Sequence, residues 1–308
     1  MSSFGSYPVG TLGKEWGATE KKTWLGNQSI KRSYQDEVVA KIWSLKSVFD
    51  IEQYGALSID VDRYPLFSLR SRGWDKNKKT ILVTGGVHGY ETSGVQGAIR
   101  FLETDAQSLQ EKLNLIVFPC VSPWGYETIN RWNPAAIDPN RSFSLGSRAE
   151  ESLSLMRHLD SIENKIDVHI DLHETTDTDN SEFRPALASR DGVELTDCSI
   201  PDGFYLVGDI ELPVSDFQRE IIHAVEQVTH IAASDEKGEI IGVTLDQRGV
   251  INYATKASGL CAGFSNAEFA TTTEVYPDSP KVDGENCIRA QVAAINAAIN
   301  YVLKIGKI

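Results

Sequence analysis

The stretch Thr80-Ile-Leu-Val-Thr-Gly-Gly-Val-His-Gly-Tyr-Glu91 joins a run of apolar and β-branched residues to a glycine-rich loop. Residues 80–84 are typical of a strand buried on both faces, and the glycine pair after them marks its end. His88 and Glu91 follow, and zinc accepts both imidazole nitrogen and carboxylate oxygen as ligands. The glycines permit the irregular backbone that a ligand loop needs. The stretch therefore predicts a buried strand with a metal-binding loop at its carboxyl end.

Strand and helix patterns alternate along most of the chain. We expect strands near residues 66–69, 80–84, 113–120 and 166–172, and helices near 38–48, 94–104, 149–159, 215–232 and 285–303. This alternation predicts an α/β fold with a mixed, largely parallel central sheet and helices on both faces. Active sites of such sheets lie at the carboxyl ends of the strands. The loops after residues 84, 120 and 172 are therefore the places to look.

The third of these strands carries an unusual set of ionisable residues. Strand alternation places Asp167, His169, Asp171 and His173 on one face. Burying four such groups is costly unless they are paired or bind a metal. His173, at the carboxyl end, is the natural further ligand. We interpret His169 as a satisfied core histidine, and Asp171 either orients a neighbour or faces a helix.

His88, Glu91 and His173 together form a two-histidine, one-carboxylate set. Such a set holds one zinc ion and leaves an open position for water, as catalytic zinc sites require. A second His-x-x-Glu pair, His223 and Glu226, lies in the middle of an expected helix without glycines. We interpret that pair as a partly exposed helix pair.

Composition excludes several classes of function. The 308 residues carry a net charge of −13, which argues against binding nucleic acid or anionic membranes. No apolar run approaches the ~18 residues of a membrane span. The N-terminal segment lacks the pattern of an export signal, so we expect a cytoplasmic protein. The four cysteines are widely spaced, without a CxxC pair, and predict neither a disulfide framework nor a cysteine zinc site: Cys120, Cys198, Cys261 and Cys287.

From Tyr64 to Leu303 the chain resembles the zinc carboxypeptidase superfamily, which also contains the aspartoacylase and succinylglutamate desuccinylase deacylases. Residues 84–91 resemble its first zinc motif. Asp171-Leu-His-Glu-Thr-Thr176 resembles its second motif, with a Thr-Thr continuation closer to the deacylases. Ser122-Pro-Trp-Gly-Tyr126 and Ile137-Asp-Pro-Asn-Arg-Ser-Phe143 resemble two intervening motifs. The resemblance implies a phosphorylase/hydrolase-like fold and a hydrolase with one zinc ion.

The resemblance also implies roles for individual residues. Glu274, in Phe269-Ala-Thr-Thr-Thr-Glu274, matches the place of the general base that takes a proton from water and passes it to the leaving amine. Glu268 is a rival, because the even separation would put both on one face of an unbroken strand. Arg131 is a candidate to stabilise the developing oxyanion.

Further matches concern the metal's surroundings and the substrate. Asp138 matches the aspartate that accepts a hydrogen bond from a metal-bound histidine. Asn140 and Arg141 match the pair that holds a substrate carboxylate. Tyr253 is a candidate for the mobile tyrosine that covers a bound C-terminal residue.

Three functions remain open on these residues. The first is a carboxypeptidase-like zinc hydrolase that cleaves a C-terminal peptide or peptide-like amide bond. The second is an N-acyl-amino-acid deacylase of the aspartoacylase and desuccinylase type. The third is a non-catalytic member that binds a carboxylate ligand. Both enzymes would take a substrate with a free carboxylate, for which we expect a locally positive cleft. We expect one domain over residues 1–308, with residues 1–65 as an N-terminal extension packed on it.

Overall fold

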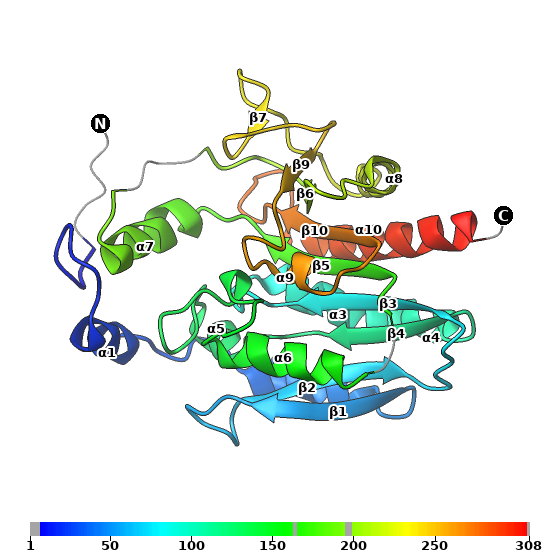
Figure 1. The fold of residues 1–308 in the computed structure, drawn as a ribbon, viewed down its shortest axis with the longest axis horizontal. Helices are drawn as coiled ribbons and strands as arrows, with labels where there is room; N and C mark the ends of the chain where they lie inside the picture. The colour runs from blue at the N-terminus through cyan, green and yellow to red at the C-terminus, as the bar shows by residue number, and fades with distance from the viewer. Residues whose placement is uncertain (1–6, 163–164, 195–198, 307–308) are drawn as a thin grey trace.

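The computed structural model describes residues 7–162, 165–194 and 199–306, and Cys198 lies outside them. Its centre is an eight-stranded sheet, shown in Figure 1. In spatial order the strands are β1 (Phe49–Ala56), β2 (Pro65–Ser71), β4 (Leu113–Phe118), β3 (Lys79–Gly85), β5 (Val168–Glu174), β10 (Phe269–Val275), β6 (Tyr205–Asp209) and β9 (Val250–Tyr253). A small hairpin of β7 (Glu239–Ile240) and β8 (Val243–Thr244) adjoins it.

The four middle strands of the sheet run parallel. β4, β3, β5 and β10 are parallel neighbours, whereas β1 with β2, β2 with β4, and β10 with β6 pair antiparallel. The carboxyl ends of the middle strands therefore lie together along one side of the sheet, perpendicular to the strands, which we call the carboxyl edge. The predicted mixed, largely parallel α/β sheet is confirmed.

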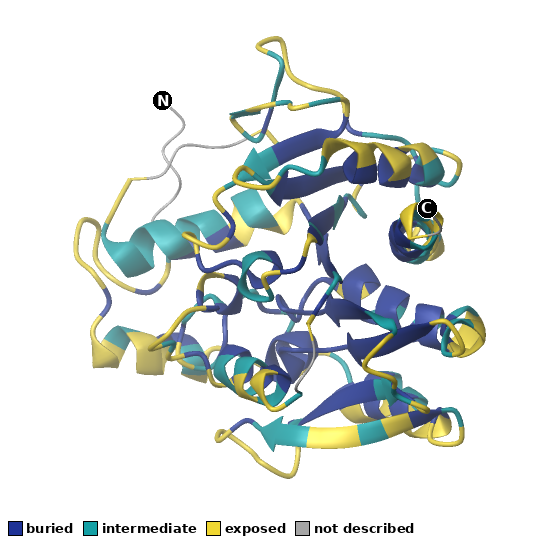
Figure 2. Ribbon diagram, turned by 45° about the vertical axis from the view of Figure 1, so that its right-hand side comes forward, coloured by how far each residue is buried: buried dark blue, intermediate teal, exposed yellow. Residues whose placement is uncertain are grey.

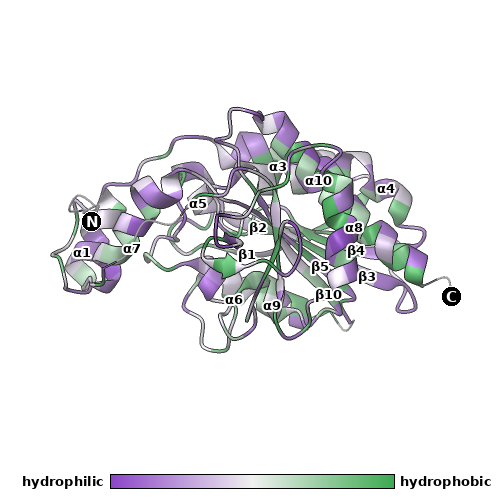
Figure 3. Cartoon of the chain, turned by 90° about the horizontal axis from the view of Figure 1, so that it is seen from above, coloured by the Kyte–Doolittle hydropathy of each residue, from purple (hydrophilic) through white to green (hydrophobic). Residues whose placement is uncertain are grey.

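Helices cover both faces of the sheet (Figures 1 and 3). One face carries α3 (Thr92–Thr104), α4 (Ala106–Leu109), α8 (Ser215–Val225) and α10 (Gly284–Ile305), and the other carries α6 (Glu150–Asp160) and α9 (Cys261–Phe264). Beyond the carboxyl edge lie α1 (Ala18–Gly26), α5 (Pro123–Thr128) and α7 (Arg184–Asp191). Shorter pieces complete the chain: η1 (Gln35–Val39), α2 (Ala40–Ser44), η2 (Pro139–Arg141) and η3 (Asp179–Phe183). No helix in the described ranges is long and apolar enough to cross a membrane.

Two differences from the expected elements have physical causes. The helix expected over 215–232 ends at Val225, and residues 228–231 instead form loop contacts with α10 and with the start of β6. β1 was not expected because its exposed positions carry Asp50 and Glu52, as suits the edge strand of a sheet.

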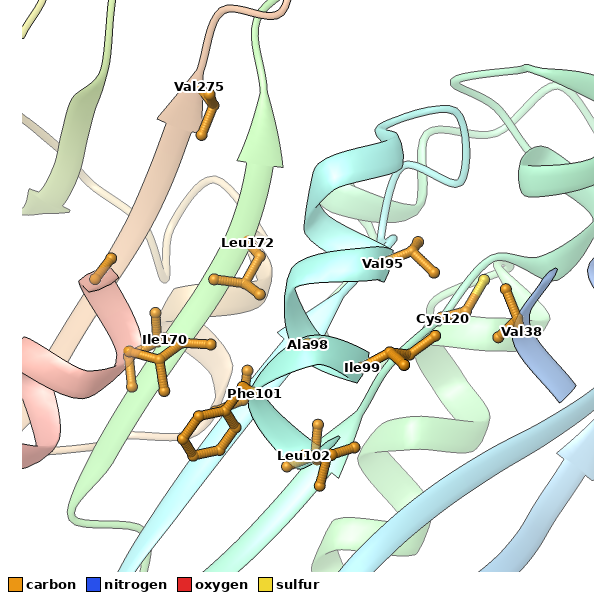
Figure 4. Close-up of a cluster of buried hydrophobic side chains, with 14 of the residues drawn as sticks. Val38, Val95, Ala98, Ile99, Phe101, Leu102, Cys120, Ile170, Leu172 and Val275 are labelled. Atoms are coloured by element: carbon orange, nitrogen blue, oxygen red, sulfur yellow. The ribbon is translucent and has the colours of Figure 1, made fainter. Parts of the chain in front are cut away.

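The core is layered between the sheet and its helices. Figure 2 shows that the middle strands are buried, while exposed residues lie on the outer helix surfaces and on edge strand β1. On the α3 side, Ala98 and Phe101 pack near Ile170 and Leu172 of β5, as Figure 4 shows. This packing fixes α3, and with it the loop that leads from β3 into α3.

The segment before β1 contacts the carboxyl edge of the sheet. Trp24 lies 5.9 Å from Trp124 and 5.6 Å from Trp132, measured between ring centroids. Trp16 donates its backbone N–H to the carbonyl of Arg190 in α7, at 2.8 Å. The N-terminal segment and α7 are thus joined beside the loops that follow the parallel strands.

A glycine sets the distance between α3 and β5. A Cβ atom at Gly94 would lie 2.5 Å from the carbonyl oxygen of Leu172, which is backbone and cannot rotate away. Gly284, in the first turn of α10, has open space at the same position. Gly94 is crowded and Gly284 is not, so the same substitution at Gly284 serves as a control for one at Gly94.

We expect Gly94→Ala to lower the free energy of unfolding by about 1–3 kcal/mol, because overpacking forces α3 away from β5. Gly284→Ala should leave stability unchanged or slightly raised, since alanine favours helix over glycine. Urea unfolding followed by circular dichroism measures both. Equal stability of the two variants would contradict a close α3–β5 approach.

Candidate functional site

The predicted metal ligands converge at the carboxyl edge of the sheet. His88 and Glu91 lie in the loop after β3, and His173 lies near the end of the neighbouring strand β5. Nδ1 of His88 is 2.7 Å from Glu91 Oε1, and Nδ1 of His173 is 2.7 Å from Glu91 Oε2. All three side chains are buried, and ligand atoms of the set lie within 4.8 Å of one another. Two imidazole nitrogens and one carboxylate, all possible metal ligands, therefore face one point.

The outer nitrogen of each histidine faces a carboxylate. Nε2 of His88 is 2.9 Å from Asp138 Oδ1, and Nε2 of His173 is 2.9 Å from Asp171 Oδ2. Each ring thus has Glu91 at Nδ1 and a second carboxylate at Nε2. Since Glu91 is itself a ligand, a cation would replace the hydrogen between Nδ1 and Glu91, and Nε2 would keep the hydrogen that it donates to Asp138 or Asp171. Burial opposes the charge on Glu91, but the two histidines lower its pKa to about 2. Two Nδ1 atoms and an ionised carboxylate fit zinc.

The ligand loop depends on close backbone approach. Gly86 has a φ of +60°, a conformation that favours glycine. At Gly89 a Cβ atom would collide with the backbone of Ser122 and Tyr126 at the start of α5. These contacts explain why glycines surround His88 in the sequence.

Arg32, in the N-terminal segment, braces the same loop. Its Nη2 donates to the carbonyl of Gly89 at 3.0 Å, and its Nε donates to the carbonyl of Tyr126 at 2.6 Å. The guanidinium also lies 3.5 Å from the ring centroid of Tyr126. The loop is therefore tied to α5 through one cation. Sequence reasoning missed Arg32, because nothing around it marks a contact made about 60 residues away.

Glu274 lies in β10 directly beside His173 in the pairing register. Its Oε2 accepts a hydrogen bond from Thr175 Oγ1 at 2.9 Å, and Tyr205 OH lies 2.8 Å from that hydroxyl. Burial raises the pKa of Glu274 to about 8, and a bound dication would lower it. The rival Glu268 lies just before the opposite end of β10, exposed, 3.5 Å from Lys165 Nζ.

Arg131 is held between two carboxylates. Its Nε is 3.2 Å from Asp138 Oδ2 and its Nη1 is 3.4 Å from Asp179 Oδ1. Burial raises the pKa of Asp138, but Arg131 and His88 outweigh burial and hold it well below its ordinary value. Asp179 was not predicted, although Thr-x-x-Asp over residues 176–179 is typical of a helix start.

Asn140 and Arg141 follow Asp138 in η2. The backbone N–H of Cys261 donates to Asn140 Oδ1 at 2.8 Å, which assigns the oxygen and turns the amide NH₂ toward His173, 3.3 Å from its Nε2. Arg141 is exposed and donates to the carbonyl of Asn140. Within the described residues Arg141 has no carboxylate partner, unlike Arg131.

These groups share one cavity of about 750 Å³. Trp16, α7 and Tyr253 contribute to its wall, so every predicted site residue lines it except His173. The described lining includes five basic residues (Lys21, Arg131, Arg141, Arg184, Arg190) and seven acidic ones (Glu15, Glu91, Asp138, Glu174, Asp179, Asp191, Glu274). Burial raises the pKa of two of these acids, Glu274 to about 8 and Glu174 to about 7, so the count of acidic residues overstates the negative charge of the cleft. The expected locally positive cleft stays a prediction.

The other histidine candidates lie elsewhere. His223 is exposed on α8, and Glu226 at the end of that helix pairs with Arg248. His169 is fully buried in β5 and hydrogen-bonded on both ring nitrogens. Neither histidine lines the cavity.

Residues 77–200 match the family model of the succinylglutamate desuccinylase/aspartoacylase catalytic domain. No curated protein matches the chain significantly. The chain resembles the structure of a proposed metallopeptidase from Shewanella amazonensis SB2B, with a TM-score of 0.64 and 21% identity over 89% of this chain and 98% of that one. It also resembles a metallo-carboxypeptidase from Burkholderia cenocepacia, with a TM-score of 0.59 and 16% identity over 87% of this chain and 68% of that one.

A metallo-carboxypeptidase from Pseudomonas aeruginosa, in complex with (2-guanidinoethylmercapto)succinic acid, has a TM-score of 0.57 and 16% identity over 86% of this chain and 68% of that one. The matched catalytic-domain model and the similar folds together support a metallohydrolase of the carboxypeptidase and desuccinylase/aspartoacylase type, within the zinc carboxypeptidase-like superfamily.

A buried carboxyl group supports the loop that carries Asp138. Glu151 of α6 accepts a hydrogen bond from Asn133 Nδ2 at 3.2 Å, and Asn133 Oδ1 accepts from the backbone N–H of Ile137. Burial raises the pKa of Glu151 from 4.5 to about 7. The folded protein then binds more protons than the unfolded chain between pH 4.5 and 7, so this group makes stability fall as pH rises through that window.

We expect Glu151→Gln to remove this fall in stability, because the neutral amide has no charge that burial could penalise. The pKa difference of Glu151 between the folded and unfolded chain corresponds to about 3 kcal/mol of unfolding free energy at pH 8. Unfolding free energies measured by urea at pH 5 and pH 8 test this, with Glu103→Gln on the exposed side of α3 as control. A variant that loses as much stability as the wild type between these pH values would contradict a neutral buried Glu151.

Proposed function

We propose that the protein is a carboxypeptidase-like zinc hydrolase that cleaves the amide bond next to a C-terminal residue. One observation supports this most: His88 and Glu91 of the ligand set line the same cavity as Glu274 and Arg141, and His173 lies beside them within the ligand cluster. A base beside the metal and a cation for a carboxylate are the two elements that such a reaction needs.

In the proposed reaction, zinc bound by His88, Glu91 and His173 supplies Lewis acidity that polarises a carbonyl and acidifies water. Glu274 takes the proton of the attacking water on its carboxylate, which Thr175 orients, and gives it to the leaving amine. Burial raises the pKa of Glu274 to about 8, and a bound dication would lower it, which would leave the carboxylate ionised and able to take the proton near neutral pH.

The protein's own donors complete the proposed site. Arg131 uses Nε and Nη1 for two carboxylates, which leaves Nη2 for the developing oxyanion. The amide NH₂ of Asn140 and the guanidinium of Arg141 bind the free carboxylate of the substrate. Tyr253, on the cavity wall, covers the bound residue.

The second candidate is an N-acyl-amino-acid deacylase, which the matched desuccinylase/aspartoacylase domain favours. The chemistry is the same, and only the group on the acyl side of the amide differs. The Pseudomonas aeruginosa relative, which has a succinic acid derivative bound, supports a carboxylate-bearing ligand for either function.

A panel of substrates separates the two enzymes and the non-catalytic alternative. Short peptides with free C-termini are compared with N-acetyl and N-succinyl amino acids under equal zinc loading. Cleavage of peptides supports the proposal, and cleavage of N-acyl amino acids alone supports the deacylase. A chain that binds no zinc by elemental analysis would contradict both enzymes.

Glu274→Gln should lower kcat by about 10²–10⁴-fold, because a neutral amide cannot take the proton of the attacking water. Zinc content by elemental analysis should stay at the wild-type value. Glu268→Gln, at the far end of the same strand, is the matched control and should leave kcat unchanged. Activity of the Glu274 variant within a factor of about 10 of the wild type would exclude it as the base.

Arg141→Ala should lower kcat/KM by about 10–100-fold, since it removes a charge-assisted bond worth about 1.5–3 kcal/mol. The loss should disappear for the same substrate with its carboxylate amidated. Arg148→Ala, an exposed residue nearby that does not line the cavity, is the control. An equal loss on both substrates would mean that Arg141 does not bind the carboxylate.

A further inference from the structure

His169 has a polar partner on each ring nitrogen although it is fully buried. Its Nε2 lies 3.0 Å from Thr84 Oγ1, and its Nδ1 lies 3.0 Å from Ser265 Oγ just after α9. It shares a face of β5 with Asp171 and His173 but does not line the cavity. Burial alone requires a partner for each nitrogen, so what distinguishes His169 is that one partner, Thr84, leads on to the metal ligand.

The contacts continue from His169 to the metal ligand. Thr84 on β3 lies beside Asp171 in the strand register, and its Oγ1 is 2.6 Å from Asp171 Oδ1. The other oxygen, Oδ2 of Asp171, is 2.9 Å from Nε2 of His173. An unbroken series of hydrogen bonds therefore joins Ser265 to His173.

Each bond in this series has a defined direction. The carboxylate of Asp171 only accepts, so the single hydroxyl hydrogen of Thr84 points to Asp171. The oxygen of Thr84 must then accept from His169, which places a hydrogen on His169 Nε2. Burial lowers the pKa of His169 to about 4, against a smaller effect of the backbone of Ala262, so the ring is neutral at pH 7. With the hydrogen on Nε2, Nδ1 accepts from the Ser265 hydroxyl. Along this series each donor therefore faces an acceptor.

A second metal ion is the competing explanation, because His169, Asp171 and Cys261 also lie close enough to share one. The hydroxyl of Thr84 occupies the middle of this cluster. Its Oγ1 lies 3.0 Å from His169 Nε2, 2.6 Å from Asp171 Oδ1 and 3.5 Å from Cys261 Sγ. A hydroxyl that bonds all three groups leaves no place for an ion among them.

The segment that ends at Ser265 also contacts the substrate side of the site. The backbone N–H of Cys261 orients the amide of Asn140, at 2.8 Å. Residues 261–265 thus hold His173 through the series and Asn140 directly. The helix α9, which ends just before Ser265, lies on the face of the sheet opposite to α3 (Figure 3).

We propose that His169 is a positioning residue that orients the metal ligand His173. It acts through the hydroxyl of Thr84, which fixes the carboxylate of Asp171, which in turn fixes the imidazole of His173 with Nδ1 toward the ion. The proposal rests on the metal site of the proposed function and extends it to residues that touch neither metal nor substrate.

Pairs of variants, one of which keeps a given hydrogen bond while the other removes it, test the hydrogen-bond series in the full-length protein. Thr84→Val removes the hydroxyl and Thr84→Ser keeps it. In His169→Asn the amide lies near the position of Nδ1 in the wild type, and the hydrogen bond to Thr84 is lost. In His169→Gln an N–H lies near the position of Nε2, and that hydrogen bond is kept. The zinc dissociation constant is measured by chelator competition, and the visible spectrum of the cobalt(II)-loaded protein reports on ligand geometry.

Thr84→Val and His169→Asn should weaken zinc binding by about 10-fold or more and shift the cobalt bands. Thr84→Ser and His169→Gln should stay close to the wild type in both readouts. Thr271→Val is the matched control: Thr271 is equally buried on β10 and bonds Gln218 at 2.8 Å, outside the series. It should lose stability without changing zinc affinity.

Wild-type zinc affinity and cobalt spectra in Thr84→Val and His169→Asn would overturn the proposal. Two zinc ions per wild-type chain, the second lost in Cys261→Ser, would also overturn it and assign the cluster to a metal. These readouts need no turnover. A chain that binds zinc but cleaves no amide would therefore contradict the proposed function alone.

Discussion

The structure depends on the burial of charge along β5. His169, Asp171 and His173 are each at most 1% exposed, in the middle of a parallel sheet. Unpaired, such groups would cost several kcal/mol each, more than a domain of this size can tolerate. Each instead has a hydrogen-bond or ion-pair partner from a neighbouring element. Because β5 is costly to bury without these partners, the elements around it must supply them at defined positions.

The surroundings of β5 follow from that requirement. β3 supplies Thr84 and then the loop with His88 and Glu91, and it can do so only because glycines let that loop lie against α5. β10 brings Glu274 into register with His173. Arg32 ties the loop to α5 from the N-terminal segment. The candidate metal site is thus assembled from strand ends that the hydrophobic core has already aligned.

Much of this arrangement was predictable from the sequence. Parallel strands end at one edge, so ligands at the ends of β3 and β5 had to meet, and the buried pattern of residues 80–84 identified the strand. The choice between Glu274 and Glu268 was not predictable by periodicity, which places both on one face. Strand direction separates them, since Glu268 lies at the amino end of β10 and faces Lys165.

Other features depend on contacts that no local pattern contains. Asp179 reaches Arg131 across a turn, and Arg32 reaches Gly89 from a segment with no motif of its own. The charge of the cleft depends on such contacts as well. Net charge and the presence of arginines say nothing about which arginines are already neutralised by carboxylates within the fold.

The charges of the cavity connect metal binding with substrate binding. Acidic residues outnumber basic ones in the described lining, and Arg131 and Arg190 are paired with carboxylates. An anionic substrate entering a protein with a net charge of −13 therefore meets Arg141 as a cation close to Asn140 that has no ion pair with a carboxylate among the described residues. A dication at His88, Glu91 and His173 would offset the acidic excess at the point where the amide must lie. In such a cavity a bound metal would both promote the proposed chemistry and make the binding of a carboxylate more favourable.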